Sequence, residues 1–543
     1  MDEKVEGGSS SFSKMSASDS LLRSSSKGLG SSIFFQSISR GLTFVLNQLT
    51  IRFTSPQAYA YSSIHFEILR STILFISRES VRLAMQRMPS QENCLEDTFK
   101  APVPDSKYRS GRLQLVKNAS VITVYAGIIV SILVAFFYMY AMPIFPYKTI
   151  CILLYSFAGF LYLLSEPYYQ ILHWRRQFSP TASAEGLGII SNTVTSFLIS
   201  FFSQSENLSV LPFAVGTLME SIVNFITLYS VANEKSLFII PRRVLHEGKL
   251  VYWEDSFLRV ISSHMFHLLL KHLMTKGDKI MIAWYATPSV QGPYALASNY
   301  GSLIARIVFR PLEEHSRIVF AQLTHSPEKQ DRKKATVLLL WILKLYFYLT
   351  MFIIFGYNYS NIVLLFGAGK KWASDESASV LSWYAFYIPF MAANGVLEAF
   401  FVSTASSLQL LSQGRCFLLS TILYFVSGKV FLDWLSLGAR GLVLANISNL
   451  LIRILFVIHF VHKNFPSLKF SESLPGLFIS LLAGLFSAIS RTLLHQFEIH
   501  NIRLLLFIAS APTLAIIYAV TILTLDKDIS MLIMSRLKKP HKD

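Results

Sequence analysis

Charged residues are scarce in this chain. Asp, Glu, Lys and Arg make up 15% of its 543 residues, whereas an ordinary soluble domain carries about 25%. Hydrophobic residues make up 52%, and this excess needs lipid to cover it. The composition therefore argues against a soluble enzyme and predicts a polytopic integral membrane protein.

Cysteine is nearly absent as well. The chain contains Cys94, Cys151 and Cys416 and no others, and three scattered thiols are too few for a disulfide framework or a zinc site. Residues 1–30 are rich in Ser and lack the apolar core of a cleaved signal peptide. We therefore expect no metal site, a disordered cytosolic tail over 1–30, and a first spanning helix that acts as the insertion signal.

Motifs for catalysis and nucleotide binding are also missing. The run Gly367-Ala368-Gly369-Lys370 lacks the spacing and the terminal Ser or Thr of a P-loop. No His-Glu-x-x-His sequence occurs, and no Ser, His and Asp set stands at motif spacing. The loops between apolar segments on the non-cytosolic side are too short for a catalytic domain. We predict a non-enzyme with no catalytic residue and no cofactor.

Long apolar segments dominate what remains. A spanning helix takes roughly 20 mostly apolar residues, and about fourteen such segments can be counted. They centre on residues 31–53, 57–77, 119–141, 148–170, 186–203, 210–231, 258–285, 290–323, 336–358, 376–403, 416–435, 440–463, 474–494 and 501–524. The prediction is an all-α protein that crosses the bilayer about fourteen times.

The net charge of +17 follows topology. Basic residues are not clustered with aromatic residues as on a nucleic-acid surface, so no nucleic-acid partner is expected. The N-terminal tail and every second loop hold about thirty Lys and Arg, against roughly seven in the other loops. The basic side includes residues 78–117, 175–176, 242–243, 332–334 and 536–542. Both termini are therefore predicted to be cytosolic.

A weak internal repeat divides the chain. Residues 55–60 (SPQAYA) and 289–295 (SVQGPYA) each open a helix that ends in an Arg and Glu cluster, and six helices separate them. An even spacing predicts parallel repeats in a two-lobed carrier. The predicted parts are an N-terminal lobe over 31–235, a cytosolic linker over 236–257, a C-terminal lobe over 258–463, and two further helices with a basic tail over 464–543.

Polar residues concentrate on four of the predicted helices, and on 31–53, 258–285 and 290–323 they recur at offsets that place them on one face. On 31–53 and 57–77 these are Gln36, Arg40, Asn47, His65, Glu67 and Arg70, and on 258–285 and 290–323 they are His264, His267, Lys271, Thr275, Asp278, Asn299, Ser302, Arg306 and Arg310. A lone cation at the bilayer centre costs about 2.5–3.5 kcal/mol. We therefore predict that these four helices line a hydrated central cavity between two pseudo-symmetric lobes.

A cavity lined by cations suits an anion, because Arg and Lys bind phosphate groups. The candidate substrate-binding residues are Arg40, Lys271, Arg306, Arg310, His65 and Asn299. Other charged residues are interpreted as gating or structural ion pairs, namely Arg78, Glu79, Glu313, Glu314, Glu166 and Glu398. From charge placement alone, an amphiphilic drug and a phosphorylated lipid both remain open as substrates.

Several sequence blocks resemble those of the eukaryotic Rft oligosaccharide-translocation family. They are residues 39–47 (SRGLTFVLN), 75–84 (FISRESVRLA), 299–314 (NYGSLIARIVFRPLEE), 394–398 (NGVLE), 444–446 (LAN) and 452–454 (IRI). The resemblance covers nearly all of the chain after about residue 31. The sequence departs from the family pattern at Leu83, where the family has Arg, and at Lys276, where it has an acidic residue.

The resemblance implies a fold like that of the multidrug extruders and the lipid II flippases. It also implies a location in the endoplasmic reticulum membrane and a dolichol-pyrophosphate-linked oligosaccharide as substrate, moved from the cytosolic to the lumenal leaflet for N-glycosylation. Membrane lipid and glycosylation-pathway proteins are the other implied partners. Two alternatives stay open: a non-transporting scaffold of the same pathway, and a cation-coupled drug exporter.

Overall fold

A computed structural model describes most of the chain. The described residues are 41, 43–85, 105–175, 177–203, 208, 210–233, 240–246, 249–324, 329–466, 468, 470, 513, 516–517, 520 and 524. At some positions within these ranges, including Lys271 and Arg306, only the backbone is described. The predicted tail over 1–30 and most of the two predicted spans after residue 470 lie outside them.

The chain divides into two compact units. The first comprises the described residues of Met1–Thr54 and Leu69–Leu269, and the second those of Ser55–Ile68 and Leu270–Asp543. The division differs from the predicted lobes, because residues 55–68 pack with the C-terminal half and residues 258–269 with the N-terminal half. Two helices therefore run from one unit into the other: α3 (Glu67–Met85) and α10 (Asp255–Tyr285).

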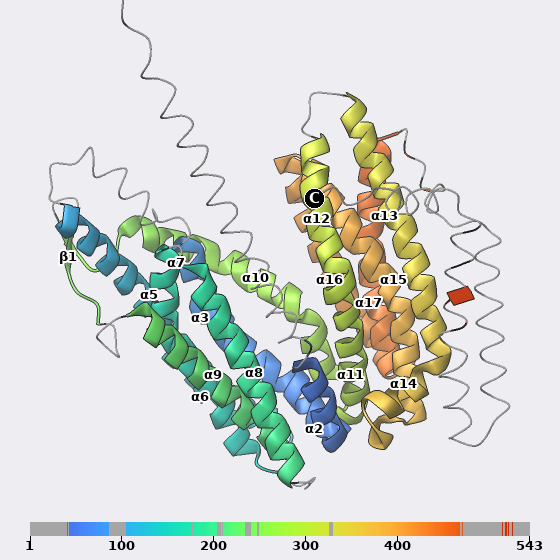
Figure 1. Ribbon diagram of the computed structural model, residues 1–543, viewed down its shortest axis with the longest axis horizontal. Helices are drawn as coiled ribbons and strands as arrows, with labels where there is room; N and C mark the ends of the chain where they lie inside the picture. The colour runs from blue at the N-terminus through green and yellow to red at the C-terminus, as the bar shows by residue number, and fades with distance from the viewer. Residues whose placement is uncertain are drawn as a thin grey trace, which may run out of the picture. The chain divides into compact units, whose positions relative to one another are not determined.

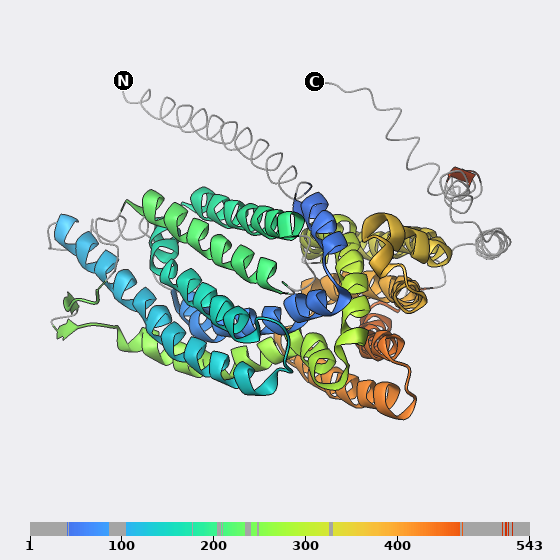
Figure 2. The same cartoon turned by 90° about the horizontal axis from the view of Figure 1, so that it is seen from below.

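The first unit is a helical bundle. Besides a helix over residues 43–53, its helices are α3, α5 (Asp105–Ala141), α6 (Lys148–Leu164), α7 (Glu166–Trp174), α8 (Phe178–Ser203), α9 (Leu211–Ala232) and the first half of α10. Helix α6 packs against α5 and α9, and α9 packs against α8 (Figures 1 and 2). Pro167 stands in the first turn of α7, so the break after Leu164 redirects the helical segment without ending it.

The second unit is also helical. Its elements are α2 (Pro56–Ala60), η1 (Tyr61–Phe66), the second half of α10, α11 (Pro288–Ile304), η3 (Ala305–Phe309), α12 (Arg310–Thr324), α13 (Lys329–Phe355), η4 (Gly356–Tyr359), α14 (Ser360–Gly367), η5 (Lys370–Trp372), α15 (Asp375–Thr404), α16 (Ser407–Lys429), η6 (Val430–Trp434) and α17 (Ala439–Asn464). Helix α15 is central, since it packs against α11, α12, α13 and α17 (Figure 1).

The helices follow the predicted spans. Seven helical stretches in the described part of the chain are long and apolar enough to cross a membrane: Gly111–Ala141, Lys148–Trp174, Ser179–Ser203, Leu211–Ala232, Asp375–Thr404, Leu408–Trp434 and Ala439–Asn464. The segments expected over 57–77, 258–285, 290–323 and 336–358 are helical too, but they carry more polar residues. The chain is an all-α polytopic membrane protein, as predicted, while the count of fourteen spans stays a prediction.

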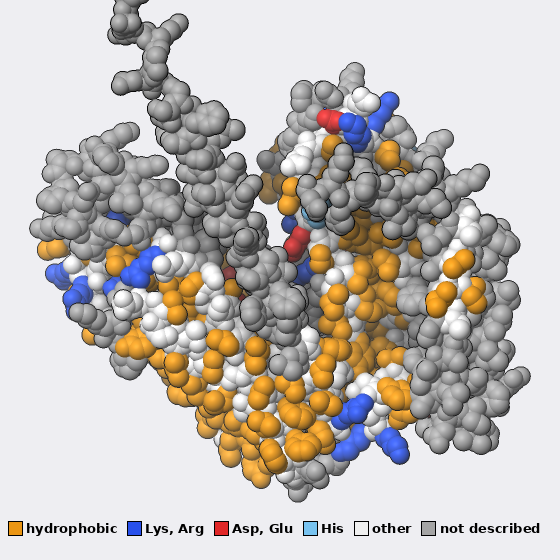
Figure 3. Space-filling model, viewed as in Figure 1, with side chains coloured by type: hydrophobic (Ala, Val, Ile, Leu, Met, Phe, Trp, Pro, Cys, Tyr) orange, Lys and Arg blue, Asp and Glu red, His pale blue; other side chains and the backbone are white. Residues whose placement is uncertain are grey.

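The outer surfaces of these helices are apolar. On α5, Ile132 is 64% exposed and Tyr140 is 77% exposed. In the view of Figure 3, hydrophobic side chains cover much of the described surface, and Lys and Arg gather near helix ends. Such a surface is stable only against lipid, because water would not cover so much apolar area without a large free-energy cost.

The predicted linker contains a small β-hairpin in the first unit. Strand β1 (Val244–His246) pairs antiparallel with β2 (Lys249–Val251), with Val244 opposite Val251. Asn118 of α5 is fully buried beneath it. Its Nδ2 donates to the carbonyl oxygens of Arg242 (2.6 Å) and Tyr252 (2.7 Å), and its Oδ1 accepts from the Arg242 N–H (2.9 Å). A single amide thus holds both ends of the hairpin.

Candidate functional site

The two helices that carry the predicted repeat begin in a similar way, although the second copy, predicted from Ser289, starts inside α11. Ser55 precedes α2 and Thr287 precedes α11, both with extended backbone, and each is followed by a proline in the first helical turn. Each helix then contains a π-helical segment, η1 in the first copy and η3 in the second. Such widened turns are rare in proteins, and those that do occur are often found at functional sites.

Helices α2 and α11 pack closely within the second unit. Gly292 of α11 lies so near the carbonyl group of Pro56 that a Cβ atom at position 292 would overlap it. Further along, Asn299 Nδ2 donates a 2.9 Å hydrogen bond to Tyr59 Oη. The repeat copies, although more than 200 residues apart in sequence, therefore meet at a common interface.

A buried amide connects this interface to α10. Gln291 Oε1 lies 2.9 Å from His65 Nε2, and Gln291 Nε2 donates to the carbonyl oxygens of Ala286 (2.7 Å) and Ile282 (3.2 Å). Because Gln291 is 1% exposed, each of these bonds replaces one that water would otherwise make. His65, predicted to bind substrate, is thus held by protein on one ring nitrogen.

A polar cavity of about 360 Å³ opens among α2, η1, α10 and α11. Hydroxyl, amide and charged groups share its walls with aliphatic side chains. It is lined by Tyr59, Ser63, Ile64, Glu67, Asp278, Lys279, Ile282, Tyr294, Ala295, Ser298, Asn299 and Ser302. We call it the polar cavity. All of its lining residues belong to the second unit.

An ion cluster stands at this cavity. Lys276 Nζ lies 2.8 Å from Glu67 Oε1, and Lys279 Nζ contacts Glu67 Oε2. Lys279 Nζ also donates to the carbonyl oxygen of Ser63 within η1 at 3.1 Å. One carboxylate therefore holds two ammonium groups, and Asp278 adds a second carboxylate to the cavity wall.

The first unit holds its arginines differently. Arg70 donates two hydrogen bonds to Glu220 (2.6 and 2.9 Å), and Arg82 donates two to Glu166 (2.5 and 2.9 Å). Arg70 was predicted to face the hydrated cavity; within the first unit, the buried Glu220 on α9 engages it as a counter-ion. The predicted ion-pair residue Glu166 does form a pair, but its partner is Arg82.

Arg78 lies between these two arginines on α3. Its guanidinium stands over the ring of Tyr162, 5.5 Å from the centroid, while Glu79 Oε1 lies 3.6 Å from Arg78 Nε. The predicted pair of Arg78 with Glu79 therefore exists as a loose contact between sequence neighbours, too long for a hydrogen bond.

A third polar group joins α12, α15 and α17. Arg453 Nη2 donates to Glu398 Oε2 at 2.9 Å, and its guanidinium lies 3.9 Å from the ring centroid of Phe417. Glu313 packs against the backbone of Gly395 so closely that a Cβ atom there would overlap its carboxylate. Arg310 and Glu314 are exposed, and no ion pair joins them among the described residues.

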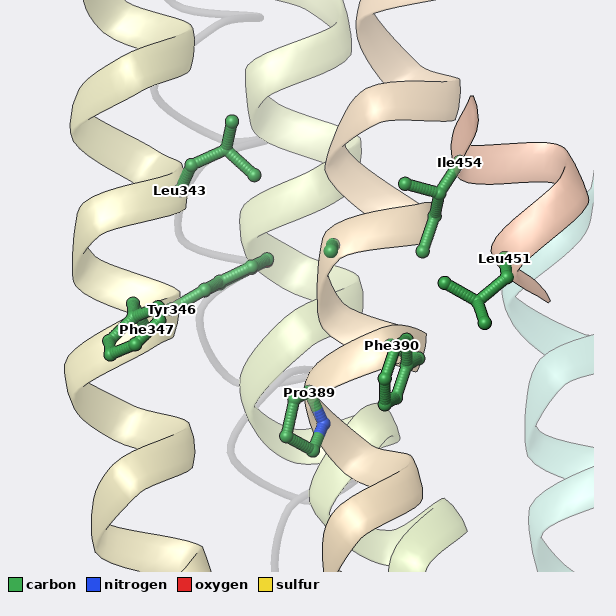
Figure 4. Close-up of a pocket in the computed structure, with 8 residues that line it drawn as sticks. Leu343, Tyr346, Phe347, Pro389, Phe390, Leu451 and Ile454 are labelled. Carbon is green, nitrogen blue, oxygen red and sulfur yellow. The ribbon is translucent and has the colours of Figure 1, made fainter. Parts of the chain in front are cut away.

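A second cavity, of about 270 Å³, is apolar and lies among α13, α15 and α17 (Figure 4). Its walls are formed by Leu343, Tyr346, Phe347, Pro389, Phe390, Ala393, Leu451 and Ile454. The labelled side chains from the three helices point toward a common space (Figure 4). It offers no charged group to an anion, so the polar cavity is the candidate site.

The predicted substrate-binding residues are only partly placed. Asn299 lines the polar cavity and His65 lies on the neighbouring η1. Arg40 lies outside the described residues, as do the side chains of Lys271 and Arg306. Within the described residues, no group of three His, Cys, Asp or Glu side chains is arranged to hold a metal ion.

Several residues of the site were not predicted. Lys279 and Tyr59 lie on helices whose polar stripes were recognised, and Lys276 was noted only as a departure from the family pattern. The stepping of Lys276 and Lys279 by three residues places both on one face of α10 and could have identified them. The partner Glu67 comes from over 200 residues earlier, and no local sequence signal joins it to them.

The sequence matches a known family over nearly its whole length. A family model described as "Rft protein" matches residues 24–536. The "Man(5)GlcNAc(2)-PP-dolichol translocation protein RFT1" of Schizosaccharomyces pombe is 57% identical over 95% of this chain and 97% of its own length. The protein of the same name from Saccharomyces cerevisiae is 30% identical over 82% of this chain and 84% of its own length.

Solved structures share the fold. A lipid II flippase MurJ in an inward closed conformation superposes with a TM-score of 0.58 at 15% identity, covering 91% of this chain and 99% of that one. An inward-facing MATE multidrug transporter gives a TM-score of 0.52 at 12% identity, covering 79% of this chain and 95% of that one. These likenesses confirm the predicted extruder and lipid II flippase fold.

Proposed function

The chain belongs to the Rft protein family, and we propose that it translocates Man(5)GlcNAc(2)-PP-dolichol from the cytosolic to the lumenal leaflet of the endoplasmic reticulum membrane. The observation that carries the proposal is the 57% identity to the Schizosaccharomyces pombe translocation protein, which extends over 95% of the chain. An identity of this size over nearly the whole chain implies a common fold.

The chemistry of this substrate sets what the protein must supply. A pyrophosphate and seven sugars cannot cross hydrocarbon unaided, because buried charges and unpaired polar groups cost several kcal/mol each. A route through the membrane therefore needs cations for the phosphates and hydrogen-bonding groups for the sugars. The polar cavity offers both kinds of group inside an apolar helical unit, which supports the proposal.

We propose that the headgroup contacts Asn299 on the cavity wall and His65 beside it. Asn299 has amide and carbonyl groups that suit sugar hydroxyls, and the ring nitrogens of His65 can donate or accept hydrogen bonds. Arg40, Lys271, Arg306 and Arg310 remain proposed phosphate contacts. Glu166, Glu220, Arg70 and Arg82 then have a structural role, since each carboxylate is already engaged by an arginine.

Translocation breaks no covalent bond, so the proposal requires neither a catalytic residue nor a cofactor. The charge asymmetry of the loops supports a cytosolic position for both termini. A pathway role implies contact with other glycosylation proteins, and this is also part of the proposal.

The test is transport by purified full-length protein in vesicles. Man(5)GlcNAc(2)-PP-dolichol is placed in both leaflets, and the fraction accessible to an external mannose-binding lectin is followed with time. The proposal predicts that all of the substrate becomes accessible at a rate proportional to protein content. If half stays inaccessible, as in protein-free vesicles, the scaffold alternative replaces transport.

A second assay, without the dolichol-linked substrate, distinguishes the exporter alternative from the proposed function. A cation-coupled exporter would move an amphiphilic cationic dye against its gradient when a sodium or proton gradient is imposed. The proposal predicts no dye transport. Of the two cavity carboxylates, Glu67 is bound by Lys276 and Lys279, and Asp278 lies between these two lysines in sequence, which disfavours a coupling cation at either.

A further inference from the structure

In the ion cluster at the polar cavity, two lysines bind one carboxylate. Glu67 contributes one carboxylate, whose two oxygens are each bound by a different ammonium group, from Lys276 and Lys279. Ion pairs elsewhere in the described residues, such as Arg82 with Glu166, match one cation with one anion. Asp278 also lines the cavity, but both ammonium groups contact Glu67, and an anion with more charge than a carboxylate would bind the two of them more strongly.

The cluster is also accessible. The Glu67 side chain is 41% exposed, and those of Lys276 and Lys279 are 24% and 25% exposed. Arg82 with Glu166 is sealed by comparison, because the Glu166 side chain is 1% exposed. A ligand can therefore reach the Glu67 cluster, and replacing the carboxylate there does not require the bundle to open.

Geometry favours exchange of one anion for another. Lys276 and Lys279 stand three residues apart on α10 and both point at one carboxylate. A phosphoryl group presents several oxygens on one atom, as a carboxylate presents two, so the same pair of ammonium groups can hold it. The phosphoryl group carries more charge and more acceptor oxygens, which gives it the stronger bonds.

The backbone around the cluster is built to hold one lysine in place. Lys279 Nζ donates to the Ser63 carbonyl oxygen in η1 as well as to Glu67. The π-helical turn η1 ends at Phe66, directly before Glu67. Lys279 would keep its bond to Ser63 after Glu67 leaves, so the cation stays positioned for an incoming anion.

We propose that Lys276 and Lys279 form a binding site for the pyrophosphate group of a polyprenyl lipid, and that Glu67 is an internal counter-ion that the pyrophosphate displaces. The inference rests on the proposed function, because it takes the substrate to be a lipid pyrophosphate. Displacement frees the Glu67 carboxylate, which then accepts hydrogen bonds from water or from sugar hydroxyls. In the empty protein, Glu67 holds both ammonium groups, and Asp278 on the same cavity wall adds a second negative charge.

The experiment measures binding and not transport. Purified full-length protein in a neutral detergent is titrated with geranyl pyrophosphate, inorganic pyrophosphate or geraniol, and binding is followed by isothermal titration calorimetry. In the wild type, geranyl pyrophosphate is expected to bind more tightly than inorganic pyrophosphate, and geraniol to show no dependence on the cluster. Equal affinity for the two pyrophosphates would overturn the assignment to a lipid.

The sign of the Glu67 effect decides between displacement and a purely structural pair. Glu67→Gln removes the competing carboxylate, so affinity for geranyl pyrophosphate should rise about tenfold. Lys276→Gln and Lys279→Gln should each lower this affinity about tenfold. Lys276→Arg keeps the positive charge and should lower it much less than Lys276→Gln. Unchanged or weaker binding by Glu67→Gln would overturn the proposal.

Matched controls come from an exposed pair on α13. Lys334 Nζ lies 2.7 Å from Asp331 Oδ1, so Asp331→Asn and Lys334→Gln change the net charge as the cluster variants do. Both should leave the affinity unchanged, and an equal effect would show that net charge alone is responsible. Melting temperatures in detergent establish that each variant is folded.

Failure of this inference can be separated from failure of the proposed function. If wild-type protein moves the lipid in vesicles while binding ignores Lys276 and Lys279, the function stands and the site is wrong. If the binding changes follow the predicted signs but no transport occurs, the site stands and the function is wrong.

Discussion

Gly292 packs directly against the backbone carbonyl of Pro56, and this contact joins the two copies of the internal repeat. It fixes the approach of α11 to α2 and therefore the walls of the polar cavity, since Tyr59 and Asn299 lie on the same two helices. Position 292 has no room for a side chain, so glycine is required there because of its size.

Gly292→Ala is predicted to push α11 away from α2. Overpacking of this kind costs about 1–3 kcal/mol, and the measurement is thermal unfolding in detergent together with loss of binding in the polar cavity. Gly414→Ala on α16 is the matched control, because a Cβ atom there meets nothing within 4 Å. A Gly292→Ala protein as stable as this control would contradict the close packing.

Removing one partner of the Arg82 and Glu166 pair is predicted to destabilise the first unit strongly. Glu166→Met leaves a partly buried guanidinium without its counter-ion, which costs about 3–5 kcal/mol. The double variant with Arg82→Met as well should be more stable than Glu166→Met, because no charge is stranded. Unfolding by detergent titration measures both, and Asp331→Asn in an exposed pair should cost at most about 1 kcal/mol.

Asn118 is predicted to control the β-hairpin. Asn118→Ala removes the three hydrogen bonds to the backbone of Arg242 and Tyr252 and a fourth from Gln114 Nε2 to Asn118 Oδ1. Asn118→Asp should fail as well, because a carboxylate cannot donate to the two carbonyl oxygens. Hydrogen exchange over residues 240–253 should rise about tenfold or more in both variants. Unaltered exchange in the Asp variant would show that donation by Nδ2 is unimportant.

Arg453 is predicted to be irreplaceable by lysine. Its guanidinium lies on the Phe417 ring while it donates to Glu398, and an ammonium group cannot stack and donate in the same way. Arg453→Lys should lower the stability of the second unit by about 1–2 kcal/mol. Arg440→Lys, at an exposed position on the same helix, is the control and should be neutral. Equal melting temperatures would argue against the stacked geometry.

Hydropathy located the spans because each requires a long apolar segment, and the segments over 148–170 and 440–463 coincide with helices within a few residues. Hydropathy could not locate the polar ends of the helices. Helix α5 begins at Asp105, well before the predicted residue 119, because its first turns carry polar residues that hydropathy does not count toward a span. The hairpin at Val244 was likewise hidden inside a polar linker.

The candidate site was predictable only as far as single helices are concerned. Stepping by three and four residues placed Asn299 on a polar face, and His65 was recognised as a polar residue of its helix; these helices do meet around Gln291 and Tyr59. Pairing between helices could not be predicted, because it depends on packing. The pair of Arg70 with Glu220 is an example, since the two residues are 150 positions apart and no local signal joins them.

The most direct test of the account is lipid translocation with the polar cavity filled. Ser63→Trp places an indole in the cavity wall, and Ser230→Trp adds the same side chain at an exposed position on α9. In vesicles containing equal amounts of folded protein, the initial rate of Man(5)GlcNAc(2)-PP-dolichol exchange between leaflets should match the wild type for Ser230→Trp and fall at least about tenfold for Ser63→Trp. Equal rates for the two variants would contradict a route through this cavity.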